Sequence, residues 1–296
     1  MTYLLIAASV LFFILQTLAL RFLKAPSLPD KLLANGCFSL LAAFVLGALC
    51  PFASGFLHVS PDTWLYGALF GALFAATLLF YNLALETGPL SYTAFYFSSS
   101  MLISALAGIF LFHETMRAVP YAVILFLIAF FLLNFPGEGQ KNTEKPNKKW
   151  YLYCFLTFLC NGSLSVVQKS HQIVLQGTEA PGLTVAGFSF AAVFCLLLWL
   201  LLFLSGKKRG LSKNPVPMLR KNLLPIVLVG LSSLSGNFLL IYLAGRTSAS
   251  YLFPLVQGSI IVGVTLISVL FFKEKLSLQG KIGLLTGIAA IVIINF

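Results

Sequence analysis

The chain alternates between long apolar segments and short polar breaks. Each apolar segment is about 20 residues long, which at 1.5 Å per residue suffices to cross a hydrocarbon core of about 30 Å. The segments are apolar on every side and do not alternate in polarity, so they are typical of membrane helices and not of barrel strands. We therefore predict ten transmembrane helices, at residues 3–23, 32–50, 63–85, 91–112, 118–135, 150–169, 183–204, 222–245, 250–272 and 278–295.

Composition supports this prediction. Hydrophobic residues make up 59% of the chain, charged residues only 9%, and the mean hydropathy is +0.97. Soluble domains carry about 25% charged residues. The longest polar breaks, 136–149 and 205–221, are too short to fold alone. We expect an all-α polytopic membrane protein whose function lies among its helices.

The net charge of +11 predicts an orientation and not a nucleic-acid partner. All of the 19 basic residues except Arg117, Lys169 and Arg246 flank the odd-numbered breaks between segments. Basic residues favour the cytoplasmic side of a membrane and anionic lipid. The odd-numbered breaks should therefore be cytoplasmic, and both termini should be extracytoplasmic, in a multi-pass protein of the cell membrane.

The two halves of the chain carry a weak repeat. A unit of five helices is odd in number, so a second copy would enter the membrane from the opposite side and form an inverted repeat. We predict a first repeat at 1–135, a basic cytoplasmic linker at 136–149 and a second repeat at 150–296, with a substrate site near midplane between them. A shift of 160 residues matches Leu79, Leu83, Ala84, Thr87, Ser99, Leu106, Phe112 and Glu114 with Leu239, Leu243, Ala244, Thr247, Ser259, Leu266, Phe272 and Glu274.

Each half ends in a related motif. The second half has an apolar helix end with a glutamate, a tight turn and a Gly-rich last helix, FFKEKLSLQGKIGLLTGIAAIVI, and the first half has the weaker FLFHETMRAVPYAVILFLIAF. With ten helices in two sets of five, the chain resembles the EamA-type branch of the drug/metabolite transporter superfamily. The resemblance implies transport of a small molecule by alternating access. Members of that family are commonly drawn with cytoplasmic termini, whereas the charges here favour the reverse.

Polar side chains inside apolar segments are candidates for the substrate site, because in lipid they usually face a bundle interior or a cavity. Tyr92, Tyr96 and Ser99 follow each other at i, i+4 and i+7, on one helix face. Polar residues of other segments, Gln16, Asn82, Asn161, Asn237 and Tyr242, are each more typical of a helix–helix hydrogen bond than of a ligand contact when taken alone. Together they suit a small amphipathic or zwitterionic solute. The predicted substrate-binding residues are Gln16, Asn82, Tyr92, Tyr96, Ser99, Asn161, Asn237, Tyr242 and Gln257.

Small residues at four-residue spacing predict close helix packing instead of binding. One such stripe consists of Ser100, Ser104 and Gly108, and two others are the pairs Gly67/Gly71 and Gly283/Gly287. Pro254 interrupts the ninth segment and predicts a bend there.

The remaining chemistry favours a transporter without cofactor or metal. The five cysteines form no C-x-x-C pair, the three histidines are scattered, and no phosphate-binding loop occurs. The acidic residues Asp62, Glu86, Glu114, Glu179 and Glu274 fall at helix ends, so we expect facilitated or exchange transport. The alternatives are a carrier of a lipid-linked substrate, an accessory membrane subunit and, with the least support, an integral membrane enzyme.

Overall fold

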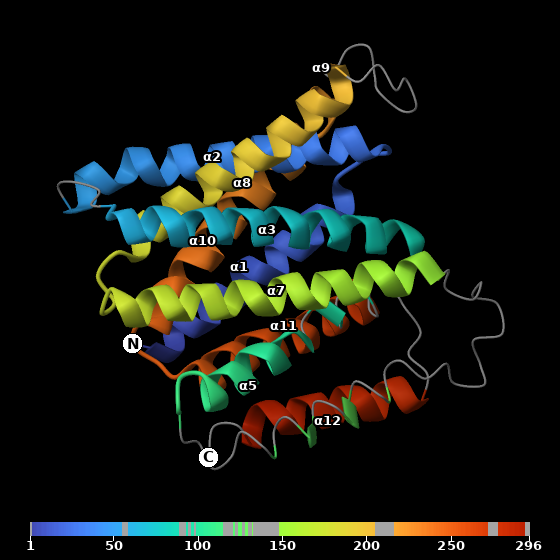
Figure 1. Cartoon of the computed structure of the whole chain (residues 1–296). Helices are drawn as coiled ribbons and strands as arrows, with labels where there is room; N and C mark the ends of the chain where they lie inside the picture. Colours follow the sequence, from blue (N-terminus) through green and yellow to red (C-terminus); the bar gives the residue numbers. More distant parts are fainter. Residues whose placement is uncertain are drawn as a thin grey trace. The chain divides into compact units, whose positions relative to one another are not determined.

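The computed structural model describes residues 2–54, 59–88, 93, 96, 97, 99–114, 121, 124, 125, 128, 129, 132, 148–204, 216–271 and 278–293. Every regular element in this part of the chain is an α-helix, which confirms the predicted all-α class. The helices are α1 (Thr2–Phe22), α2 (Leu28–Ser54), α3 (Pro61–Thr87), α5 (Met101–Phe110), α7 (Lys148–Val174), α8 (Ala180–Leu204), α9 (Val216–Lys221), α10 (Leu223–Ala244), α11 (Ala249–Phe271) and α12 (Leu278–Ile293) (Figure 1).

Seven of these helices are long and apolar enough to span a membrane: α1, α2, α3, α7, α8, α10 and α11. They coincide with the first three and the sixth to ninth predicted segments, so the chain is a multi-pass membrane protein. Within the fourth and tenth segments the structure describes the shorter helices α5 and α12. Most of the fifth segment, 118–135, lies outside the described residues.

Helix α7 extends beyond its predicted end at residue 169. Its 27 residues span about 40 Å, more than the roughly 30 Å of a hydrocarbon core. The helix ends where Gln176 and Gly177 take positive φ angles of 51° and 76°. The backbone N–H of Gly177 then donates to the carbonyl of Gln172 at 2.9 Å, as in a glycine-terminated helix.

The chain divides into two compact units. Unit 1 comprises residues 1–82 and 167–245, and unit 2 comprises residues 83–166 and 246–296. Each unit therefore draws on chain from both sides of the linker 136–149. The predicted halves, 1–135 and 150–296, are defined by a repeat in the sequence, whereas the units are defined by contacts in space. The inverted repeat itself stays a prediction.

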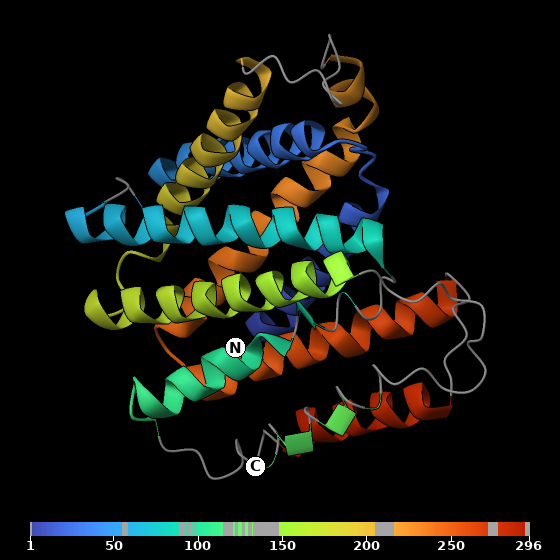
Figure 2. The same cartoon turned by 45° about the vertical axis from the view of Figure 1, so that its right-hand side comes forward.

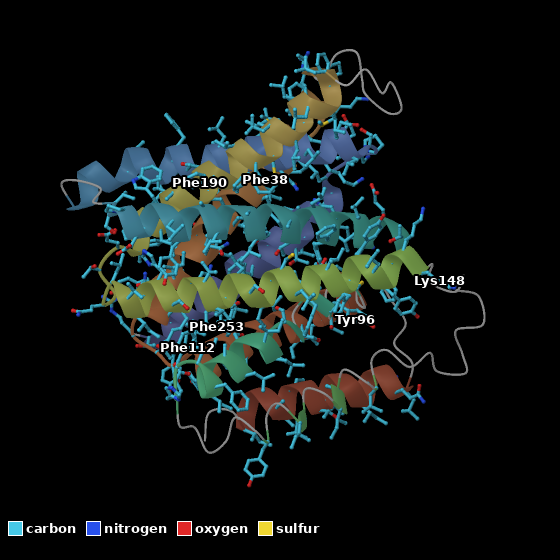
Figure 3. The ribbon with its side chains drawn as sticks, in the orientation of Figure 1. Phe38, Tyr96, Phe112, Lys148, Phe190 and Phe253 are labelled. Carbon is cyan, nitrogen blue, oxygen red and sulfur yellow. The ribbon has the colours of Figure 1, made fainter. Side chains whose placement is uncertain are left out.

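In unit 1, α2 packs along α8, and α10 contacts both α1 and α2 (Figure 1). Helix α3 approaches α8 at two glycines: a Cβ on Gly67 would lie 2.6 Å from the Cβ of Ala186, and one on Gly71 only 2.6 Å from the backbone nitrogen of Ala191. This confirms the close packing predicted for that pair. Figure 3 shows Phe38 and Phe190 within this unit.

In unit 2, α11 packs against both α5 and α12, and the two views agree on this arrangement (Figure 2). A Cβ on Gly108 of α5 would lie 2.9 Å from the backbone nitrogen of Ser250, so the predicted close approach at this glycine is confirmed. A Cβ on Gly287 of α12 would lie 3.9 Å from the Cβ of Ala129, which is ordinary contact. The tight packing predicted at Gly287 is therefore not found among the described residues.

Candidate functional site

Glu114 binds the beginning of α11. Its carboxylate oxygens accept hydrogen bonds from the backbone N–H groups of Ala249 and Ser250, both at 2.8 Å, and from the Ser250 hydroxyl at 2.8 Å. The missing side chain of Gly108 leaves room for this carboxylate, because a Cβ there would lie 2.7 Å from Oε2. A negative charge at a helix N-terminus satisfies free N–H groups and complements the helix dipole. Glu114 thus holds a helix end.

Two buried charges in unit 1 have comparable positions. An oxygen of Glu179, which lies just before α8, accepts from the backbone N–H of Ser60 at 3.0 Å, next to the first turn of α3. The ammonium group of Lys169 donates to the carbonyl of Ala244 at 2.9 Å, at the last residue of α10. A cation at a helix C-terminus is favourable for the same reason as an anion at the N-terminus. Both contacts thus place a charge at a helix end.

Seven amide side chains are buried in the described part of unit 1. Asn222 and Gln172 lie near helix ends, and we call the other five the unit 1 amides. Two pairs are hydrogen bonded: Asn82 Nδ2 lies 3.4 Å from Asn35 Oδ1, and Gln168 Nε2 lies 3.1 Å from Asn237 Oδ1. These bonds connect α3 to α2 and α7 to α10. The unit 1 amides are Gln16, Asn35, Asn82, Gln168 and Asn237, each at most 7% exposed.

Two contacts place Gln16 along α10. Ser9 in α1 donates to the carbonyl of Gly236 at 3.3 Å, and the backbone N–H of Lys24, just after α1, donates to Asn222 Oδ1 at 2.7 Å. Helices α1 and α10 are therefore antiparallel. Gln16 lies between the two contacts, so it falls beside the middle of α10. Polar side chains are rare at this depth of a membrane helix because burying them is costly.

Several buried polar atoms of unit 1 have no hydrogen-bond partner among the described residues. One is Gln172 Oε1, near the end of α7, and four others are Gln16 Oε1 in α1, Asn35 Nδ2 in α2, Thr77 Oγ1 in α3 and Ser233 Oγ in α10. A buried polar atom without a partner costs about 1–3 kcal/mol. The four atoms on α1, α2, α3 and α10 comprise an acceptor, a donor and two hydroxyls.

Unit 2 contains an aromatic contact at Tyr96. The ring of Tyr96 meets that of Trp150 edge to face, with centroids 5.6 Å apart and planes at 88°. The indole nitrogen of Trp150 donates to Thr93 Oγ1 at 3.0 Å, and Cys154 packs in the same cluster. Tyr96 is half-buried and lies toward the end of this unit that carries Lys148 (Figure 3). Its packing partner was not part of the predicted site.

Asn161 joins α7 to the segment before α5. Its Nδ2 donates to Ser100 Oγ at 2.6 Å and to the carbonyl of Phe97 at 3.3 Å. Ser100, predicted as a packing residue, therefore also accepts an interhelical hydrogen bond. Ser99 is buried. Gln257 in α11 is 5% exposed, and its Oε1 has no partner in the described part of the chain.

The predicted site residues fall in both units. Unit 1 holds Gln16, Asn82, Asn237 and Tyr242, and unit 2 holds Tyr96, Ser99, Asn161 and Gln257. Tyr242 is half-buried, with its ring centroid 6.4 Å from that of Phe238. Tyr92 lies outside the described residues. The structure gives these residues positions, and their role in binding stays a prediction.

Sequence reasoning missed Asn35, Gln168 and Trp150. The signal for Asn35 was present, because Lys31, Asn35 and Ser39 recur at four-residue spacing and all three are buried on α2. Gln168 lies near the predicted end of its segment, where polar residues are common and do not indicate a site. Among the described residues, no group of three His, Cys, Asp or Glu side chains could hold a metal ion.

Comparison with known proteins agrees with this architecture. The sequence profile of the EamA-like transporter family matches residues 148–296. No curated protein matches the sequence. A solved crystal structure, described only as that of a protein, is similar over 99% of this chain and 96% of its own, with a TM-score of 0.70 and 18% identity, and it supports the fold alone. The chain, a multi-pass helical membrane protein, belongs to the EamA-like transporter family of the drug/metabolite transporter superfamily.

Proposed function

We propose that the chain is a secondary transporter that moves a small organic solute across the cell membrane by alternating access. The observation that carries this proposal is the set of unit 1 amides, together with the unpartnered atoms beside them. Uncharged donors and acceptors in an apolar interior bind a solute weakly enough to release it again. The family to which the chain belongs is a family of transporters and not of enzymes.

We further propose ten membrane-spanning helices in two inverted repeats, with both termini extracytoplasmic. Within each unit, the hydrogen bonds between loops join breaks of the same parity, as an alternating path across a membrane requires. The breaks after the first and seventh segments meet, as do those after the second and sixth, and those after the fourth and eighth. The residue pairs are Lys24 and Asn222, Ser60 and Glu179, and Glu114 and Ala249.

Facilitated or exchange transport fits the position of the acids. The carboxylates of Glu114 and Glu179 are engaged at helix N-termini. Asp62 and Glu86 lie at the two ends of α3 and are exposed. None of these four lies at the middle of a described helix, where a buried acid would carry a coupling proton.

A thermal-shift screen of the purified full chain tests the proposal. The probes are amino acids, nucleobases, sugars, vitamins and cationic drugs. A compound that binds only the folded protein stabilises it by about 2.7 kcal/mol at 100 times its Kd. We expect a hit whose effect is lost in Gln16→Met, which removes the buried amide, and kept in Gln279→Met, the same change at an exposed position of α12.

Two outcomes contradict the proposal. A folded protein that no probe stabilises would favour a lipid-linked substrate or an accessory role. A hit that survives Gln16→Met, Asn82→Leu and Asn237→Leu would place binding away from the unit 1 amides.

A further inference from the structure

Four buried side chains form a continuous hydrogen-bonded chain at one end of unit 1. Glu179 Oε2 lies 2.5 Å from Thr63 Oγ1, and Thr63 Oγ1 lies 2.8 Å from Nε2 of His171. Nδ1 of the same imidazole lies 2.9 Å from Gln172 Nε2. All four side chains are at most 8% exposed. None of them belongs to the unit 1 amides.

The donors in this chain can be assigned in one direction. A carboxylate only accepts, so the single hydroxyl proton of Thr63 is donated to Glu179. Thr63 Oγ1 must then accept from His171, which places a proton on Nε2. The amide nitrogen of Gln172 only donates, so Nδ1 is the acceptor and carries no proton. With the Gln172 amide in this orientation, the contacts fit a neutral imidazole with its proton on Nε2.

Gln172 offers a second arrangement. Its Oε1 is buried and has no hydrogen-bond partner among the described residues. If the side-chain amide turned over, Oε1 would replace Nε2 beside the imidazole and accept from a protonated Nδ1. Next to Oε1 is Gly245, where a Cβ would lie 2.9 Å away, so the absent side chain leaves room for the amide.

We propose that His171 is a proton-binding site whose occupancy is set by the orientation of the Gln172 amide. A hydronium ion gives its proton to Nδ1: one of its O–H bonds breaks, water is left, and the imidazole gains one positive charge. The hydrogen bond from Gln172 Nε2 to Nδ1 is replaced by one from Nδ1 to Oε1. The Glu179 carboxylate, across the Thr63 hydroxyl, balances that charge. After proton uptake, every contact in the chain is again a hydrogen bond with a donor and an acceptor, and only the contact between His171 and Gln172 has changed direction.

The surrounding groups do not supply a competing proton site. Helix α3 contributes Thr63 and the ring of Tyr66, whose centroid lies 5.5 Å from that of the imidazole. On α7 itself, Lys169 is directed to the carbonyl of Ala244. Asp62, beside Thr63 in the sequence, is exposed. Glu179 is the acid that directly faces the chain.

Because the chain connects α3, α7 and the residue before α8, a proton at His171 would change how firmly these helix ends are held together. This use in transport rests on the proposed function, as a proton-sensitive control at one end of the transporter. The proton binding itself does not depend on it, so the two can fail separately.

Nuclear magnetic resonance of the full chain in lipid nanodiscs, with ¹⁵N-labelled histidine, tests the proposal without a transported solute. The chain has three histidines, at positions 58, 113 and 171, and His171→Gln identifies the relevant signals. Near pH 8 we expect the neutral tautomer with its proton on Nε2. As the pH is lowered from about 8 to about 3 in folded protein, we expect a proton to bind Nδ1.

Variants of Gln172 make the test specific. Gln172→Glu offers only acceptor oxygens, so it should move proton uptake to higher pH by at least about 1 unit. Removal of an exposed histidine by His113→Asn should leave the His171 signals unchanged, and asparagine tolerates the positive φ of 53° at that position. A wild-type imidazole protonated on Nδ1 near pH 8, or one that binds no proton at any pH at which the protein stays folded, would overturn the proposal. So would identical titrations of wild type and folded Gln172→Glu.

Discussion

The carboxylate of Glu114 accepts a hydrogen bond from the backbone N–H of Ala249 at 2.8 Å, and so ties the residues after α5 to the first turn of α11. The glutamate is thus part of the packing of unit 2. Since its charge complements a helix end, we expect it to stabilise α11 and not to carry protons through the membrane interior.

Glu114→Ala should therefore destabilise the protein by about 1–2 kcal/mol, the usual cost of losing a helix cap. A thermal melt in detergent would measure the lower Tm. Glu86→Gln, at an exposed position near the end of α3, serves as the control with little change. We also expect Glu86→Gln and Glu114→Gln to retain transport of any solute found in the screen. Complete loss in both folded variants would argue for a coupling role.

The glycines of α3 and α12 predict opposite results for the same substitution. Gly71→Ala would drive a Cβ to 2.6 Å from the Cβ of Phe190 and from the Ala191 backbone, so we expect a loss of about 1–3 kcal/mol. Gly287→Ala meets its nearest described atom at 3.9 Å, and alanine is the better helix former by up to about 1 kcal/mol. Melting both variants side by side compares them. Equal effects would mean that α3 can move away from α8 at no cost.

The hydrogen bond between Asn161 and Ser100 should be measurable as a coupling energy. A double-mutant cycle of Asn161→Ala and Ser100→Ala, followed by unfolding in detergent, isolates the pair. Interhelical polar contacts in membranes average about 0.6 kcal/mol and reach about 1.7 kcal/mol. We expect a value toward the upper figure because the two atoms lie 2.6 Å apart and both residues are buried. A coupling of zero would leave Asn161 free to contact a solute.

Gln16 and Asn82 should differ in stability although both are predicted to bind solute. Gln16→Met removes a buried oxygen that has no partner in the described residues, so the free protein should keep or gain stability. Asn82→Leu breaks the contact with Asn35 and should lower Tm. Melting curves without added solute separate the two. A marked loss of stability in Gln16→Met would show that its amide is structural.

Orientation can be tested at the C-terminus. A reporter enzyme that is active only outside the cytoplasm, fused after Phe296, should be active, because the basic residues favour cytoplasmic odd-numbered breaks. The same reporter placed in the linker 136–149 is the matched control and should be inactive. The reverse pattern would invert the proposed topology.

The fold could be predicted from sequence in the membrane-spanning segments, because lipid requires their backbone groups to bond within each helix. An uninterrupted apolar run must be helical, and α1, α8 and α10 match their segments within a few residues. The prediction stopped α7 short because His171 and Gln172 look like loop residues. Thr63, on α3, contacts the His171 imidazole, and Gly177, in the turn after α7, donates to the backbone carbonyl of Gln172.

The candidate site was only partly predictable for a related reason. A buried amide such as Asn82 can be found by its polarity, but its partner Asn35 depends on which helices pack together. The same holds for Trp150, which marks a segment boundary in the sequence and becomes the packing partner of Tyr96 in the structure.

Trp150 also gives the protein an optical probe of its own. The chain has three tryptophans, and Trp150 is the one that is 2% exposed, whereas Trp64 is 49% exposed and Trp199 is half-buried. Replacing Trp64 and Trp199 with phenylalanine would leave a single emitter, bonded to Thr93 and stacked edge-on by Tyr96. Its emission wavelength would follow rearrangements of unit 2 in real time, without any attached dye.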